Sequence, residues 1–302
     1  MATKPETDTP VFETPGRFEK LYNEYEGTKW SRVAIYGGLS MYLLWTLFPV
    51  YWMVTGSLKT REGLLTFPPQ WIPLQMEISN YVVLFTQRPE FWRFILNSMI
   101  VTIATTIIAT FLGACAAYGF VAFDWPYDLD FHLPFYILST RFMPPIVVAI
   151  PIYVIFRDIA LVNTLPGLIL LYVMFNVPFV VWMMKGFFDE IPDSLVESAM
   201  IDGHTHLGAF FKIVLPLAKP GLFASGIFAM IITWNELLFA LIITHSADAA
   251  TLPVGLSSLI TQYTIQWELI SVAGTIAMIP VLIFAFIVRD ELVRGFSMGV
   301  DG

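Results

Sequence analysis

Six long stretches of this chain contain almost no charged residues, and this pattern limits its possible folds more than any other feature. A helix needs about 20 mainly apolar residues to cross the hydrocarbon layer of a membrane. The stretches do not alternate between apolar and polar residues, as the strands of a transmembrane barrel would. We therefore predict an all-α integral membrane protein with six transmembrane helices. The six stretches are Val33–Leu58, Phe94–Phe123, Phe131–Phe156, Ile159–Met184, Pro220–Ala247 and Leu269–Val288.

The overall composition excludes several other classes of protein. Only 13% of the 302 residues are charged and 57% are hydrophobic, whereas soluble domains carry about 25% charged residues. The net charge of −8 argues against a nucleic-acid partner, because binding to phosphates needs a clustered basic face. The single cysteine, Cys115, excludes an intramolecular disulfide and a cysteine metal cluster.

Two of the six stretches contain a charged residue or a cluster of prolines. Arg141 interrupts the third stretch and Glu236 interrupts the fifth. The third stretch also contains three prolines, which predict a helix that is kinked or broken near its far end; they are Pro144, Pro145 and Pro151.

The charged residues inside the membrane are candidates for the translocation path. At about 1.5 Å per residue, Arg141 lies roughly 15 Å into the third helix, near the middle of the membrane. A charge at that depth is expected to face the bundle interior or a watery cavity rather than lipid. Two interpretations remain open: a structural pair between Arg141 and Glu236, or a path residue Arg141 that meets the solute with Asn235 nearby.

An even number of spans places both termini on the same side of the membrane. Ten Lys and Arg residues lie on the side of the termini and six on the other, so the positive-inside rule favours cytoplasmic termini. The predicted parts are a cytoplasmic tail over 1–32, a first transmembrane helix over 33–55, a periplasmic loop over 56–92, a core over 93–290 with a patterned cytoplasmic loop over 189–219, and a cytoplasmic tail over 291–302.

Motifs for catalysis and metal binding are missing from the sequence. Without a Gly-Lys dipeptide there is no phosphate-binding P-loop, and there is no Gly-x-Ser-x-Gly elbow. His204 and His206 are two residues apart, so on a helix they would point in different directions. We therefore predict no catalytic and no metal site. A membrane-bound enzyme or an assembly scaffold is the less favoured reading, because it would need a catalytic cluster at one membrane surface.

The loop over 189–219 is too long and too patterned for a simple connection. Ser194 to Glu197 has the spacing of a capping box that opens a helix, and Gly203 breaks that helix. A second segment, Leu207–Leu215, ends at Pro216. The loop is therefore predicted to form two short helices, either as a rigid projection or as an amphipathic element on the membrane surface.

Residues in this loop carry a family resemblance. Glu197-Ser198-Ala199, then Gly203, then Ile213, Leu215 and Pro216 resemble the EAA signature of permease subunits in binding-protein-dependent ABC importers, with serine in place of the usual second alanine. Further stretches, such as Phe67–Trp71, Trp234–Glu236 and Leu252–Gly255, resemble the carbohydrate branch, the relatives of the smaller maltose permease subunit. The acidic segment Asp124–Asp130 departs from the family, which is typically basic there.

The resemblance implies the type I ABC importer permease fold and a place in a larger assembly. The core over 93–290 would be the ABC permease region, and the loop over 189–219, with Asp202 among its contacts, would couple to ATPases. The implied partners are a second homologous permease, two ATPase subunits, a solute-binding protein and membrane lipid, in the inner or plasma membrane of a prokaryote. This chain would bind no cofactor itself, and Mg-ATP would sit on the ATPase subunits. An ion-coupled secondary transporter is the alternative, although it predicts inverted repeats. The solute stays open among sugars, polyols, phosphodiesters and sulfonated sugars.

Overall fold

The computed structural model describes residues 29–261 and 265–298, and within these ranges the chain is helical and has no strands. The predicted all-α membrane fold is therefore confirmed. The helices are α2 (Lys29–Ser57), α3 (Arg61–Leu65), α4 (Ser79–Gln87), α5 (Glu90–Val121), η1 (Pro126–Asp128), α6 (Leu129–Ser139), η2 (Thr140–Phe142), α7 (Pro145–Asp158), α8 (Leu165–Asp189), α9 (Asp193–Ile201), α10 (His206–Ala209), η3 (Phe210–Val214), α11 (Leu215–Leu217), α12 (Lys219–Trp234), α13 (Leu238–Ile243), α14 (Leu252–Ser257) and α15 (Trp267–Met298).

Four of the described helices, α2, α5, α8 and α15, are long and apolar enough to cross a membrane, and two bent pairs raise this number to six. One bent pair joins the segment Pro126–Phe142 to α7, and the other joins His206–Leu217 to α12. The chain divides into two compact units, Met1–Met53 and Val54–Gly302. All the contacts described below lie within the second unit.

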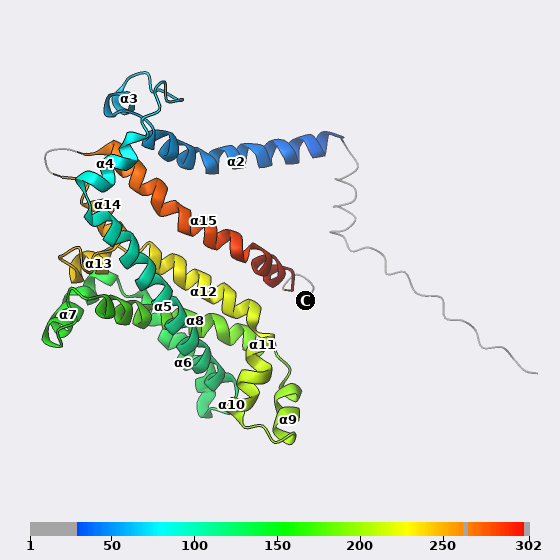
Figure 1. Ribbon diagram of the computed structural model, residues 1–302. Helices are drawn as coiled ribbons and strands as arrows, with labels where there is room; N and C mark the ends of the chain where they lie inside the picture. The colour runs from blue at the N-terminus through cyan, green and yellow to red at the C-terminus, as the bar shows by residue number, and fades with distance from the viewer. Residues whose placement is uncertain (1–28, 262–264, 299–302) are drawn as a thin grey trace, which may run out of the picture. The chain divides into compact units, whose positions relative to one another are not determined.

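The centre of the second unit is a bundle in which α5, α8 and α12 pack against one another and α15 packs against α12 (Figure 1). Buried apolar residues fill the bundle at both ends. Val180, Met184 and Phe188 of α8 meet the end of α5 in one cluster, and Phe94 of α5 meets Leu252 of α14 in another. The helices α9 and α10 lie at the first of these ends and α14 at the second (Figure 1).

A glycine allows the close approach of α5 to α8. A Cβ atom added at Gly113 would overlap the side chain of Val180, whereas a Cβ at Gly119 of the same helix would meet nothing within 4 Å. Small residues at such crossings let helix backbones approach and maximise van der Waals contact in membranes.

The Gly113→Ala variant is therefore expected to destabilise the protein. Overpacking of this kind costs about 1–3 kcal/mol, so the midpoint of thermal unfolding in detergent should fall. Gly119→Ala is the matched control and should keep or slightly raise the midpoint, because alanine favours a helix more than glycine does. Equal midpoints for the two variants would contradict a tight contact between α5 and α8.

The third apolar stretch is broken, but in its middle rather than near its far end. The segment Pro126–Phe142 and α7 meet at an angle of 92°. Met143 and Pro144 between them have extended ψ angles of 129° and 126°. The reason is the Pro144-Pro145 pair: a residue that precedes proline is pushed out of the helical region, so two successive residues leave it. Pro151 lies inside α7 without breaking it.

The fourth and fifth stretches also differ from their predicted extents. The fourth helix begins at Leu165 instead of Ile159, because Ala160 and Asn163 adopt positive φ angles and the hydroxyl of Thr164 caps the new start by accepting from the amide of Gly167 at 3.1 Å. The fifth stretch is not one helix. Its first part, α12, ends at Trp234, and α13 begins at Leu238.

The segment between α2 and α5 is held in place by hydrogen bonds. Asn80 of α4 is buried and donates its Nδ2 to the carbonyl oxygens of Ser57 (3.0 Å) and Lys59 (2.9 Å). Lys59 is also buried, and its ammonium donates to the carbonyl of Gln70. Burial lowers the pKa of this lysine, because the charged form is poorly solvated there.

Candidate functional site

The cytoplasmic loop predicted from the sequence begins with α9, which carries the Glu-Ser-Ala motif. This helix starts at Asp193, with Pro192 in the N-cap position and no side-chain cap. The predicted capping box of Ser194 and Glu197 is therefore wrong. Pro192 combines a φ of −59° with an extended ψ of 128°, so the N-cap lies two residues before Ser194. Asp193 then places a negative charge in the first turn, where the helix dipole favours it.

The predicted break after α9 occurs at Gly203, and its geometry is specific. Gly203 has a φ of +86°. Its amide donates to the carbonyl of Met200 at 3.1 Å, and the amide of His204 donates to the carbonyl of Ala199 at 3.0 Å. These two bonds form a Schellman motif, which needs a left-handed residue at this position and is most often closed by glycine. The hydroxyl of Thr205 then caps α10 by accepting from the amide of Gly208 at 3.2 Å.

The second half of the loop runs further than predicted. It comprises α10, a π-helical turn η3 and α11, and it passes Pro216, where the sequence predicted its end. Pro216 lies in the first turn of α11, a position where the missing amide hydrogen costs little. The break comes at Ala218, after which α12 turns away at 79°. Ile213 and Leu215 are half-buried in this segment and Pro216 is exposed.

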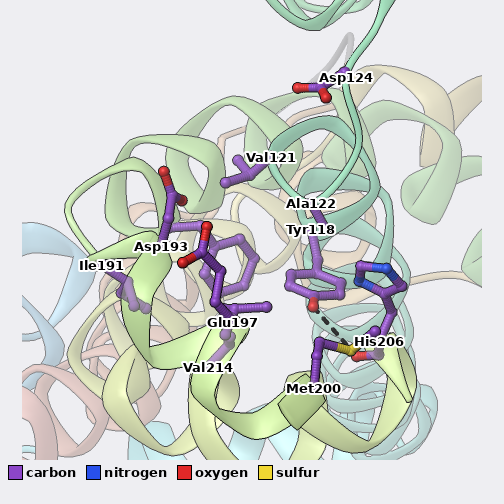
Figure 2. A pocket seen from close by; sticks show the side chains of 12 residues that line it. Tyr118, Val121, Ala122, Asp124, Ile191, Asp193, Glu197, Met200, His206 and Val214 are labelled. Carbon is purple, nitrogen blue, oxygen red and sulfur yellow. Dashed lines mark hydrogen bonds between the residues drawn. The ribbon is translucent and has the colours of Figure 1, made fainter. Parts of the chain in front are cut away.

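The loop closes over a pocket of about 300 Å³ at the ends of α5 and α8. Figure 2 shows the carboxylates of Asp193 and Glu197 on one side of this pocket and Tyr118 and His206 on the other. The hydroxyl of Tyr118 donates to the carbonyl of His206 at 3.2 Å and so ties α5 to α10. Glu197 of the motif therefore lies with Asp193 on the acidic side of a pocket that is anchored to the bundle.

Some residues of the motif are buried and anchor α9 to the bundle, whereas others are exposed and can contact a partner. Ala199 is buried against the bundle, whereas Glu197, Ser198 and Asp202 are exposed. The hydroxyl of Ser198 donates to the carbonyl of Ser194 at 2.7 Å, so serine fits where alanine is usual. The exposed acids are thus free to meet another molecule.

Sequence reasoning missed two members of this site, Tyr118 and Asp193. Asp193 follows a proline and precedes an apolar stripe, a pattern typical of the first turn of a helix, and this signal was present in the sequence. Tyr118 lies 88 residues before its partner His206, and no local pattern links two positions so far apart.

The second group of predicted residues lies inside the membrane-spanning part. Glu236 occupies the gap between α12 and α13. Its carboxylate accepts from the hydroxyl of Tyr172 at 2.6 Å and from the amides of Phe239 and Ala240 at 2.9 and 3.2 Å. These amides open α13 and have no partner within that helix. Glu236 therefore holds α13 and links it to α8.

Arg141 lies elsewhere. Its guanidinium stands over the ring of Phe179 at 5.5 Å, and it forms no ion pair with any residue that the structure describes. Of the two interpretations that the sequence left open, the structural pair of Arg141 with Glu236 is not formed, because the carboxylate accepts hydrogen bonds from Tyr172 and from the start of α13. Asn235 is exposed and donates to the carbonyl of Ile231 at 2.8 Å, and it does not line the cavity beside Arg141.

Comparison with known proteins shows which family the chain matches. Residues 28–298 match the family model described as "Binding-protein-dependent transport system inner membrane component". The chain is 33% identical over 261 residues to the sulfoquinovosyl glycerol transport system permease protein SmoH of Agrobacterium fabrum, covering 86% of this chain and 90% of the relative. It is 34% identical over 261 residues to the trehalose transport system permease protein SugB of Mycobacterium tuberculosis, covering 84% and 92%.

Among solved structures, the chain resembles a subunit of a bacterial ABC transporter involved in the import of the acidic polysaccharide alginate. The TM-score is 0.71 at 19% identity, covering 93% of this chain and 99% of the other. This likeness confirms the predicted importer-permease fold, and the family match makes the chain a multi-pass membrane protein. The chain belongs to the family of inner membrane components of binding-protein-dependent transport systems.

Proposed function

We propose that this chain is the permease subunit of an ATP-driven importer of sugars or sugar-like solutes. It would work with a second homologous permease, two ATPase subunits and a solute-binding protein, and Mg-ATP would be bound by the ATPase subunits alone. The transport systems of the relatives SmoH and SugB are named for sulfoquinovosyl glycerol and for trehalose, which supports a carbohydrate cargo. Nothing in the family match supports the ion-coupled alternative.

The observation that carries this proposal is the geometry of the cytoplasmic loop. Two short helices are joined by the Schellman turn at Gly203 and expose the carboxylates of Glu197 and Asp202. A rigid acidic projection of this kind suits a basic groove on a partner, because opposite charges steer and orient docking. The buried contacts of Ala199 and Tyr118 would pass the motion of such a partner to α5.

The proposed mechanism is alternating access. Closure of the ATPase dimer would draw the loops of the two permeases together and tilt the helices connected to them. The pathway would then open outward beneath the docked binding protein. The orientation that this requires, with both termini in the cytoplasm of a prokaryote, agrees with the excess of Lys and Arg on that side of the predicted spans.

Uptake by the reconstituted complex tests this function. The chain should copurify with an ATPase subunit, and proteoliposomes should accumulate a radiolabelled sugar only with Mg-ATP and the binding protein. Omission of either is expected to lower uptake at least about tenfold, since ATP binding and solute delivery are both needed for each cycle. Uptake driven by an ion gradient without ATP would contradict the proposal and favour the secondary transporter.

A further inference from the structure

A cavity of about 790 Å³ lies at the break between α6 and α7, inside the third membrane-spanning stretch. The polar residues in its wall are Ser139, Thr140 and Arg141, and the other wall residues include Tyr136 and Phe175. The function proposed above assigns no role to any of these residues, although the sequence offered Arg141 as a candidate for the translocation path.

The broken backbone at this cavity argues against contact with lipid. Met143 and Pro144 are extended, so the carbonyls at the end of the preceding turn lose their helical partners. Backbone of this kind is tolerated at membrane depth only where protein covers it or where it lines a water-filled space. The break therefore marks a part of the membrane-spanning region that faces protein or a water-filled space rather than lipid.

Arg141 supplies a positive charge to this cavity that no described residue neutralises. Its guanidinium is half-buried and rests over the ring of Phe179. Such a contact fixes the plane of the group and leaves its N–H donors available. An intramembrane charge without a partner marks a functional site by default, and the planar fork of arginine matches a carboxylate or a related oxyanion in two parallel hydrogen bonds.

The neighbouring groups suit the remainder of a sugar. The hydroxyl of Ser139 donates to the carbonyl of Tyr136 at 2.6 Å, and that of Thr140 donates to the carbonyl of Ile137 at 2.7 Å. Each hydroxyl oxygen therefore keeps lone pairs that can accept from sugar hydroxyls. The aromatic rings of Tyr136 and Phe175 offer flat apolar surfaces against which the C–H face of a pyranose can pack.

We propose that this cavity is a solute-contact point of the permease and that Arg141 binds an oxyanion of the transported sugar, such as a carboxylate, sulfonate or phosphate. The inference rests on the proposed function and narrows its substrate class to acidic sugars. Arg141 is then a binding residue, and its charge rather than its bulk sets the preference.

The test uses the purified complex of permeases and ATPases, trapped with ATP and vanadate, and sodium glucuronate as the probe. Glucuronate at tens of millimolar should raise the midpoint of thermal unfolding by at least 2 °C, whereas glucose with sodium chloride at equal ionic strength should not. Sodium acetate controls for a carboxylate without a sugar. Arg141→Gln should abolish the shift, and Arg141→Lys should require several-fold more glucuronate because it keeps the charge without the fork.

Arg157→Gln is the matched control, because Arg157 is exposed at the end of α7 and paired with Asp158 at 2.9 Å; it should retain the full shift. Equal shifts with glucuronate and glucose, or an undiminished shift in Arg141→Gln, would overturn the proposal. The proposal would also be overturned by two results together: no response of the wild-type complex to glucuronate, and failure of Arg141→Gln to assemble. Arg141 would then pair with an acid of another subunit. The proposed function is judged separately, by ATP-dependent uptake.

Discussion

Replacement of Glu236 with alanine is expected to destabilise the protein more than any other single substitution considered for this chain. The change leaves the amides of Phe239 and Ala240 and the hydroxyl of Tyr172 without an acceptor at membrane depth, where water cannot replace it. Hydrogen bonds to a charged group contribute about 1.5–3 kcal/mol each. The total loss should be about 3–5 kcal/mol, because removal of a half-buried carboxylate offsets part of it, and the midpoint of thermal unfolding should fall by on the order of 10 °C.

Tyr172→Phe provides the graded comparison for this substitution. It removes one of the three hydrogen bonds to Glu236 and keeps the aromatic ring. The free energy of unfolding should therefore fall by at most about 3 kcal/mol, less than for Glu236→Ala. A double variant should cost little more than Glu236→Ala alone, because the two residues act through the same bond. Wild-type stability of Glu236→Ala would show that the carboxylate does not hold α13.

Substitution of Gly203 should uncouple ATP hydrolysis from transport. An L residue at a φ of +86° is strained by roughly 1–2 kcal/mol, and a β-branched side chain is penalised more. A Cβ at this position meets nothing within 4 Å, so the effect is conformational rather than steric. Gly203→Val should insert normally, lose at least about tenfold in sugar uptake and leave the ATPase activity unresponsive to the binding protein.

The Gly203→Asn variant, in the same assay, distinguishes the effect of backbone strain from the effect of side-chain size. Asparagine tolerates the left-handed region better than other L residues, so this variant should keep most of the uptake although its side chain is about as large as that of valine. Normal uptake by Gly203→Val would sink the proposed role of the turn. Equal loss in both variants would show that the side chain itself disturbs the partner contact.

Much of the fold follows from local chemistry in the sequence. The apolar stretches predicted the long helices, because the need to bury backbone polar groups leaves a membrane-spanning chain few alternatives. The Pro144-Pro145 pair predicted that the third helix breaks, and Gly203 predicted the turn after α9. In both of these cases the effect is local: each proline restricts the residue before it, and glycine reaches the positive φ that other residues avoid, so no distant partner is needed.

The parts that could not be predicted depend on partners far away in the sequence. The sequence left a pair between Arg141 and Glu236 open, but it could not show that both helices are interrupted beside these residues. Glu236 is bound instead by the start of α13 and by Tyr172, 64 residues away. The capping box failed for a local reason, because the geometry of Pro192 outweighed the spacing of Ser194 and Glu197.

The two interruptions that flank α12 let it move as a rigid helix that can tilt about either end. It is 16 residues long, or about 24 Å, and lies between the bend at Ala218 and the gap at Asn235. Rocking by about 10° about the bend at Ala218 would carry the other end of α12 about 4 Å sideways. Because that other end is tied to α8 by the hydrogen bonds Tyr172–Glu236 and Asn176–Thr233, we expect a displacement of the loop over 189–219 to be passed along α12 and to shift its far end against α8.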